Sequence, residues 1–145
     1  MKNLTKLIAL MLVIAAALSV LVSCGGTDAA GKATLVIEGD SLTEYEVSLD
    51  EFEGNSVADM LNYLKETKGI AFEYSGTMVT QVGDVKNDDG AGKWVYFWTS
   101  VADDMDVTEW VSYVEYDGKQ LASSGKNVFE MTVADGAVIY VGYYR

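Results

Sequence analysis

The sequence predicts an α+β domain built from one helix and about seven strands. Apolar residues recur at helical spacing in a single segment that follows residue 56. Elsewhere, short runs of β-branched and aromatic residues are separated by turn-forming Asp, Ser and Gly. The chain has 145 residues, of which 50% are apolar, and this suits one domain with its own core.

Residues 33–38 and 45–49 are predicted to form the first hairpin. Each run is rich in β-branched residues or alternates between apolar and polar residues, and Gly39, Asp40 and Ser41 lie between the two runs as a turn. We therefore expect these runs to be the first two strands of the sheet.

The single predicted helix begins after Asn55 or Ser56. Asp59 lies three residues after Ser56, so the two can form a capping box. Two lysines in the last turn suit the negative end of the helix dipole, and Gly69 provides the stop. The apolar positions are Val57, Met60, Leu61 and Leu64, and the two lysines are Lys65 and Lys68.

The second half of the chain supplies the remaining predicted strands. The densest aromatic run in the sequence is one of them, and a polar, glycine-rich loop over residues 83–92 precedes it. Asp-Gly pairs at 117–118 and 135–136 mark turns. The predicted strands are residues 71–74, 78–82, 93–99, 110–116, 128–133 and 138–144.

The composition excludes several classes of chemistry. The chain has no His and one Cys, so it cannot build a His-based catalytic triad, an internal disulfide or a Cys/His zinc site. Its 22 acidic residues outnumber its 10 basic residues, which gives a net charge of −12. Such a field repels phosphate backbones, so nucleic acid is not expected as a partner, whereas cationic or neutral ligands are compatible with it.

The first 23 residues have the features of a signal peptide. Lys2 and Lys6 precede a weakly polar to apolar run over residues 7–22, which is too short to span a membrane. The run ends in Leu-Val-Ser-Cys, which resembles the bacterial lipobox and makes Cys24 the site of lipid attachment. We therefore expect cleavage after residue 23, a flexible tether over residues 24–32, and a lipid anchor on the outer face of the bacterial cytoplasmic membrane. The alternative is an ordinary signal or an uncleaved anchor with an incidental Cys.

The order of motifs after the tether resembles a domain family of unknown function found in bacterial surface lipoproteins. That family is similar to the C-terminal β-domain of transcobalamin and intrinsic factor. The resemblance covers residues 33–145 and implies a β-grasp-like fold, in which a mixed sheet packs against one helix. The matching segments are SVADML (56–61), Gly69 and Ile70, residues 76–85, residues 92–99, and residues 131–140 with their Asp-Gly turn.

The same resemblance implies a binding module, with a corrinoid as a candidate ligand and no resident cofactor. Transcobalamin uses a separate helical barrel with an axial His, and this chain has neither. A corrinoid would therefore bind weakly, to a dimer, or with a partner that covers its second face. The acidic segment over residues 101–110 departs from the family pattern at the rim that would face the ligand.

An aromatic platform is the candidate ligand-binding site. In a strand, Trp94, Tyr96 and Trp98 share one face, while Val95, Phe97 and Thr99 share the other. The rings could stack on a planar ligand, with Trp110 folding over them from the acidic segment. Packing of these rings in the core is the alternative interpretation.

A cluster of carboxylates is the second candidate site. Side chains of this kind could gather a hard cation or act as an acid-base pair in glycoside hydrolysis, and a solvated acidic loop is the alternative. No complete metal motif is present, so we expect no metal site. The carboxylates are Asp103, Asp104, Asp106 and Glu109.

These observations predict a lipid-anchored, extracytoplasmic binding module that is not an enzyme. Its partners would be the membrane, through the lipid on Cys24, and either a small molecule or a surface protein. The alternative is a structural or interaction domain that acts by pairing a sheet edge with another chain. A carboxylate hydrolase is the less favoured third function.

Overall fold

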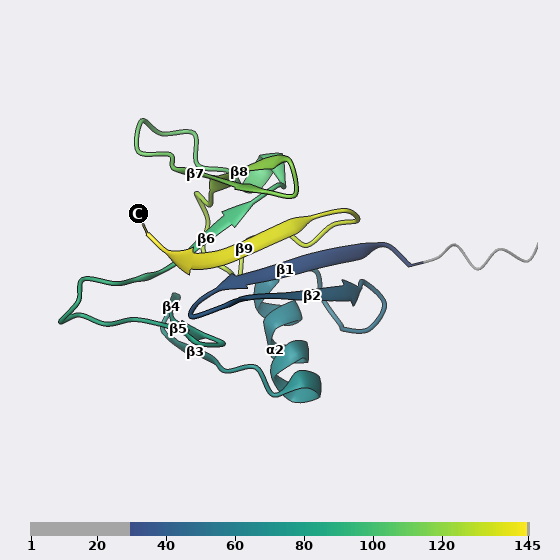
Figure 1. Ribbon diagram of the computed structural model, residues 1–145. Coiled ribbons are helices and arrows are strands. Elements are labelled where there is room, and N and C mark those ends of the chain that lie inside the picture. The colour runs from purple at the N-terminus through teal and green to yellow at the C-terminus, as the bar shows by residue number, and fades with distance from the viewer. Residues whose placement is uncertain (1–29, 145) are drawn as a thin grey trace, which may run out of the picture. The chain divides into compact units, whose positions relative to one another are not determined.

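The computed structural model describes residues 30–144, which contain nine strands in two sheets and one α-helix (Figure 1). This arrangement is an α+β fold, and its single helix is the predicted one. In chain order the elements are β1 (Lys32–Glu38), β2 (Leu42–Ser48), α2 (Val57–Lys68), β3 (Phe72–Ser75), β4 (Met78–Val82), β5 (Val85–Lys86), β6 (Val95–Thr99), the 3₁₀ turn η2 (Ala102–Asp104), β7 (Tyr113–Tyr116), β8 (Lys119–Ser123) and β9 (Val138–Tyr143).

The strands form a six-stranded sheet and a three-stranded sheet. The larger sheet has the order β2-β1-β9-β6-β8-β7, and the smaller one has the order β3-β4-β5. The first and last strands, β1 and β9, pair in parallel, while the other pairs are antiparallel, so the larger sheet is mixed. The structure thus differs from the expected single sheet of about seven strands. Strand β5 lies inside the predicted loop, β8 was not predicted, and β3, β4 and β5 form a separate sheet.

Helix α2 begins and ends with the predicted caps. Ser56 Oγ accepts a hydrogen bond from the Asp59 N–H, and Asp59 accepts one from the Ser56 N–H at 3.0 Å. The Ser56 hydroxyl also donates to Asp59 Oδ2 at 2.6 Å, and the two hydrogen bonds that the Asp59 carboxylate accepts from the Ser56 side chain and backbone lower its pKa. At the other end Gly69 adopts a φ of 70°, a left-handed conformation that favours glycine.

The predicted strand over residues 128–133 is wrong. This segment instead supplies acceptors to the start of α2: the Ala58 N–H donates to the Val128 carbonyl, and the Val57 N–H donates to the Met131 carbonyl. The first N–H groups of a helix have no partner within the helix, so they need acceptors from elsewhere. Val128, Met131 and Val133 are buried here, but the segment forms no continuous ladder and has a single bridge, between Ser56 and Thr132.

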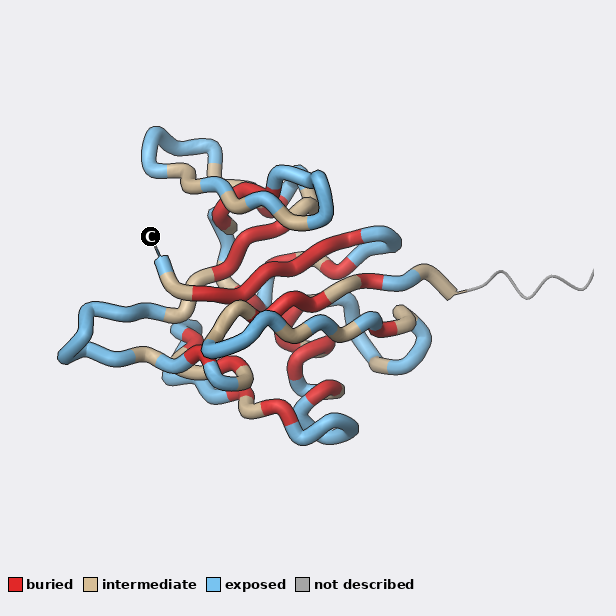
Figure 2. The backbone as a smooth tube through the Cα atoms, viewed as in Figure 1, coloured by how far each residue is buried: buried red, intermediate tan, exposed pale blue. Residues whose placement is uncertain are grey.

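One face of the larger sheet packs against α2 and the smaller sheet. Figure 2 shows that buried residues run along β9 and its neighbours β1 and β6. The side chains that point toward α2 form the main core with the apolar face of the helix. They include Leu35, Ile37, Val47, Phe97, Ile139 and Val141.

The β7–β8 hairpin covers the opposite face of the larger sheet (Figure 1). Strand β8 pairs with β6 at only two positions, Trp98 with Ser123 and Thr99 with Ala122. Beyond these pairs the hairpin leaves the plane of the sheet and packs on its face. The second core that results contains Val36, Trp98, Leu121, Val138 and Tyr140.

The predicted signal peptide over residues 1–23, the lipid-attachment residue Cys24, and most of the tether over residues 24–32 lie outside the described residues. Strand β1 begins at Lys32, one residue before the predicted start of the domain. Within residues 30–144, no helix is long and apolar enough to cross a bilayer.

Replacing Ser56 with Ala removes the side-chain half of the capping box. We expect the free energy of unfolding, measured by urea denaturation, to fall by about 1 kcal/mol. Ser41 is exposed and its side chain makes no hydrogen bond in the structure, so Ser41→Ala is the matched control. Equal stability of Ser56→Ala and Ser41→Ala would contradict the assigned cap.

Candidate functional site

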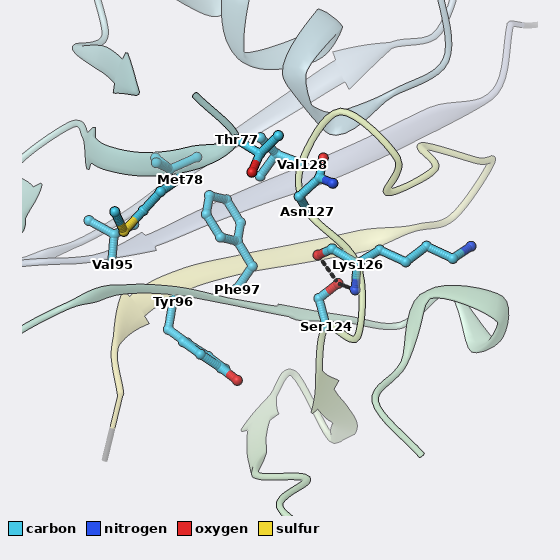
Figure 3. Close-up of a pocket in the computed structure, with 10 residues that line it drawn as sticks. Thr77, Met78, Val95, Tyr96, Phe97, Ser124, Lys126, Asn127 and Val128 are labelled. Atoms are coloured by element: carbon cyan, nitrogen blue, oxygen red, sulfur yellow. Dashed lines mark hydrogen bonds between the residues drawn. The ribbon is translucent and has the colours of Figure 1, made fainter. Parts of the chain in front are cut away.

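Strand β6 separates its aromatic side chains as the alternation predicts. Phe97 faces α2 and belongs to the main core, whereas Tyr96 and Trp98 face the hairpin and belong to the second core. Figure 3 shows Phe97 and Tyr96 on opposite sides of the strand. The face opposite α2 is therefore the aromatic face of the sheet.

Five rings form a continuous row across this face, which we call the aromatic row. Their centroids lie 5.0 Å apart for Tyr144 and Tyr96, 5.2 Å for Tyr96 and Trp98, 6.0 Å for Trp98 and Tyr140, and 6.2 Å for Tyr140 and Tyr116. Three of these pairs meet edge to face, the geometry that aromatic quadrupoles favour. Three strands, β6, β7 and β9, contribute to the row along with the residue after β9.

Trp98 is the centre of this row and is held by the hairpin. Only 2% of its surface is exposed, and its Nε1–H donates a hydrogen bond of 3.0 Å to Ser112 Oγ. The Ser112 N–H in turn donates to Ser123 Oγ, also at 3.0 Å. The start of β7 is therefore tied to both β8 and the Trp98 ring.

A cleft opens where the hairpin leaves the sheet, and we call it the aromatic cleft. Its volume is about 310 Å³. Buried Trp98 and Tyr140 contribute to its lining together with exposed Tyr113 and two carboxylates. The complete lining is Glu38, Trp98, Ser112, Tyr113, Val114, Glu115 and Tyr140.

A second opening of about 350 Å³ lies at the tip of the hairpin, and we call it the tip opening. Burial raises the pKa of Tyr116, and a hydrogen bond to Glu44 of β2 raises it further. Lys32 pairs with Glu46 at 2.5 Å, and this hydrogen bond raises the pKa of Lys32. Residues that line the tip opening include Lys32, Glu44, Glu46, Tyr116, Asp117, Lys119 and Asp135.

The four residues of the predicted aromatic platform do not gather in one place. Tyr96 and Trp98 are in ring contact, but Trp98 is buried, as the core-packing interpretation expects. Trp94 is 45% exposed and Trp110 is 73% exposed, and within residues 30–144 neither ring contacts another aromatic ring. The expected cover by Trp110 is therefore wrong, because the β7–β8 hairpin covers this face instead.

Several residues around the aromatic row were not singled out by the sequence. Tyr113, Glu115 and Glu38 line the aromatic cleft, yet they lie on two strands that the sequence does not place together. The last strand does carry a usable signal. Alternation along β9 places Tyr140 on the aromatic face and Tyr143 on the other, where its ring lies 5.1 Å from Lys93 Nζ.

The acidic segment does not form a carboxylate cluster. Asp104 is fully buried, binds Lys126 Nζ at 2.7 Å and accepts a hydrogen bond from the Thr132 N–H. The hydrogen bond to Asp104 raises the pKa of Lys126. Asp106 accepts a hydrogen bond from the Thr108 N–H within its own turn. The described residues contain no group of three or more Asp, Glu, Cys or His side chains that could hold a metal ion.

A smaller hollow of about 190 Å³ lies on the other side of β6 (Figure 3). Met78 and Val95 stand on one side of it, and Phe97 and Val128 close it. A turn borders it, in which the Ser124 hydroxyl donates to the Lys126 carbonyl and accepts from the Lys126 N–H. This hollow is largely apolar, and no carboxylate lines it.

Comparison of the chain with protein-family models, with curated proteins and with solved structures gives no match.

Replacing Trp98 with Ala leaves a void in the second core and removes the hydrogen bond to Ser112. We expect the free energy of unfolding to fall by about 3–5 kcal/mol. The exposed Trp94→Ala control is expected to change it by about 0.5 kcal/mol or less. Urea denaturation followed by circular dichroism measures both, and Trp98→Phe supplies a milder variant if Trp98→Ala does not fold. A larger loss for Trp94→Ala than for Trp98→Ala would contradict the burial of Trp98.

Proposed function

We propose that this chain is a lipid-anchored, extracytoplasmic binding module without enzymatic activity, and that its ligand site is the aromatic cleft. The observation that carries the proposal is the incomplete cover of the aromatic face. The hairpin buries the middle of the aromatic row, but it leaves a cleft that is lined by Trp98, Tyr140 and the exposed Tyr113. Concave sites that combine aromatic surface with a few polar groups are typical of small-molecule binding.

The size of the cleft favours a small ligand or one end of a larger one. Its volume of about 310 Å³ is at the lower end of the range for ligand pockets, which is about 300–1,000 Å³. A whole corrinoid is too large to be enclosed, so a corrinoid would insert only one edge of its ring system. A small aromatic or aliphatic ligand would be held more completely.

The lipid anchor rests on the sequence alone. The signal-peptide pattern and the lipobox-like residues before Cys24 support export and attachment to the outer face of the cytoplasmic membrane. A small domain of this kind would then present its ligand site outside the cell.

We also propose that the fold is β-grasp-like. A first hairpin, β1–β2, precedes the helix, and the last strand, β9, lies parallel to β1 near the centre of the sheet. This order supports the resemblance to the transcobalamin C-terminal domain. The curled β7–β8 hairpin is an addition to that simple arrangement.

Sheet-edge pairing is a second candidate function, because β2 is an edge strand. The Leu49 N–H bonds to Gly31 on the β1 side, so alternation directs the N–H groups of Glu44 and Glu46 away from the sheet. A partner strand could add there. Glu44→Pro would remove an outward donor and leave the β1–β2 hydrogen bonds in place.

The proposal predicts saturable binding that depends on the cleft. Equilibrium dialysis of the full chain in detergent would use cobalamin, cobinamide and a panel of small aromatic, amine and sugar compounds. For a compound that binds, we expect Tyr113→Ala to weaken the affinity about five- to thirtyfold. Tyr74→Ala is the matched control, because Tyr74 is similarly exposed but lies on β3.

Two outcomes would contradict the proposed function. One is the failure of every compound to bind the folded chain. The other is equal binding by Tyr113→Ala and Tyr74→Ala. A protein partner that is crosslinked on cells and lost with Glu44→Pro would then favour sheet-edge pairing.

A further inference from the structure

We propose that the aromatic cleft selects an organic cation that carries an ammonium group. This inference rests on the proposed function, because it names the chemical class of ligand for the same cleft. It is carried by three features of the described residues: the chemistry of the lining, the charge of the surrounding face, and the exposed ring of Tyr113 in the cleft.

The lining combines rings with carboxylates and contains no cationic side chain. Trp98, Tyr113 and Tyr140 supply the rings, and Glu38 and Glu115 supply the carboxylates. The faces of aromatic rings attract cations, and Trp is the strongest of these ring types. Carboxylates accept charge-assisted hydrogen bonds from N–H groups or pair with a quaternary ammonium through charge alone.

The neighbouring tip opening strengthens the negative field. It is lined by the carboxylates Glu44, Glu46, Asp117 and Asp135 and by the ammonium groups of Lys32 and Lys119. Lys32 is already paired with Glu46. Together the two openings present six carboxylates and two ammonium groups on one face of a chain whose net charge is −12. A field of this sign attracts cations and repels anions as they approach.

The aromatic part of the lining favours an organic cation over a metal ion. Trp98 and Tyr140 are 2% and 5% exposed, so each offers a ligand only a small area of ring, and Tyr113, which is 56% exposed, offers the most. Ring surfaces offer no ligand to a hard metal ion, which needs six or more oxygen atoms or retained waters. An ammonium group with attached carbon atoms can use the rings and the carboxylates together.

The hollow of Figure 3 provides a contrast within the same molecule. Its lining includes Lys126 and no carboxylate. Its aromatic residues are Phe97, which faces α2, and Tyr96, and neither of them lines the aromatic cleft. An organic cation should therefore bind in the aromatic cleft and not in the hollow, whereas a neutral apolar compound can bind in the hollow.

The test uses three probes of nearly the same shape and different charge. They are choline, its neutral isostere 3,3-dimethylbutan-1-ol, and the anion 3,3-dimethylbutanoate, each titrated into the full chain in detergent by isothermal calorimetry. We expect choline to bind about tenfold or more tightly than the alcohol, and the anion to bind most weakly. We also expect added salt to weaken the binding of choline.

Glu115→Gln removes one cleft carboxylate and keeps the shape of the side chain. It should weaken choline binding about three- to tenfold. Glu73→Gln causes the same change in net charge on exposed β3 and should have a smaller effect. Equal effects of the two substitutions would assign the attraction to total charge and overturn a cation site in the cleft.

The probes separate failure of this inference from failure of the proposed function. If the alcohol or the anion binds as tightly as choline and Tyr113→Ala weakens that binding, the cleft binds ligands but does not select cations. If choline does not bind to the folded chain, the cation inference is overturned. In that case the proposed function is decided by the broader panel of corrinoids, aromatic compounds and sugars.

Discussion

The fold depends on a central strand pair that is apolar on both faces. In β9 the first five residues, 138–142, are buried, and β6 beside it carries Phe97 on one face and Trp98 on the other. Apolar surface on both sides of a sheet must be covered on both sides to be removed from water. Helix α2 covers one face, and the β7–β8 hairpin covers the other. The rest of the described chain connects and supports these two covers.

The two covers are built differently, and the difference creates the candidate site. Helix α2 is fixed at its start by a capping box and by carbonyls of residues 128–133, so its apolar face lies flat against the sheet. The hairpin is joined to β6 at only two register positions and is otherwise held by side chains, among them the Trp98–Ser112 hydrogen bond. Because a curled hairpin cannot match a whole sheet face, openings are left at its margins. Acidic and aromatic residues of the surrounding strands line these openings.

Local signals predicted the helix and most strands, since caps, helical spacing and turn residues act over a few positions. Residues 128–133 show where local signals fail. Their apolar residues predict a strand, but in the fold this segment supplies carbonyl acceptors to the N–H groups at the start of α2. Alternation also assigned Tyr96 and Trp98 to one face of the sheet. Local sequence could not show that β7 and β8, which are distant in the chain, would cover that face. Glu38 and Glu115 meet at the cleft for the same reason, so no local pattern could have indicated them.

The central claim is that a ligand enters beneath the hairpin and beside Trp98, and the three tryptophans allow a direct test. Their indole N–H groups can be followed by nitrogen-15 NMR during a titration with choline. The account predicts that the Trp98 indole signal, whose N–H bonds to Ser112, shifts together with the amides of residues 112–115. The signals of exposed Trp94 and Trp110 should stay in place. Shifts confined to Trp94, Trp110 or the residues of the hollow around Met78 would contradict it.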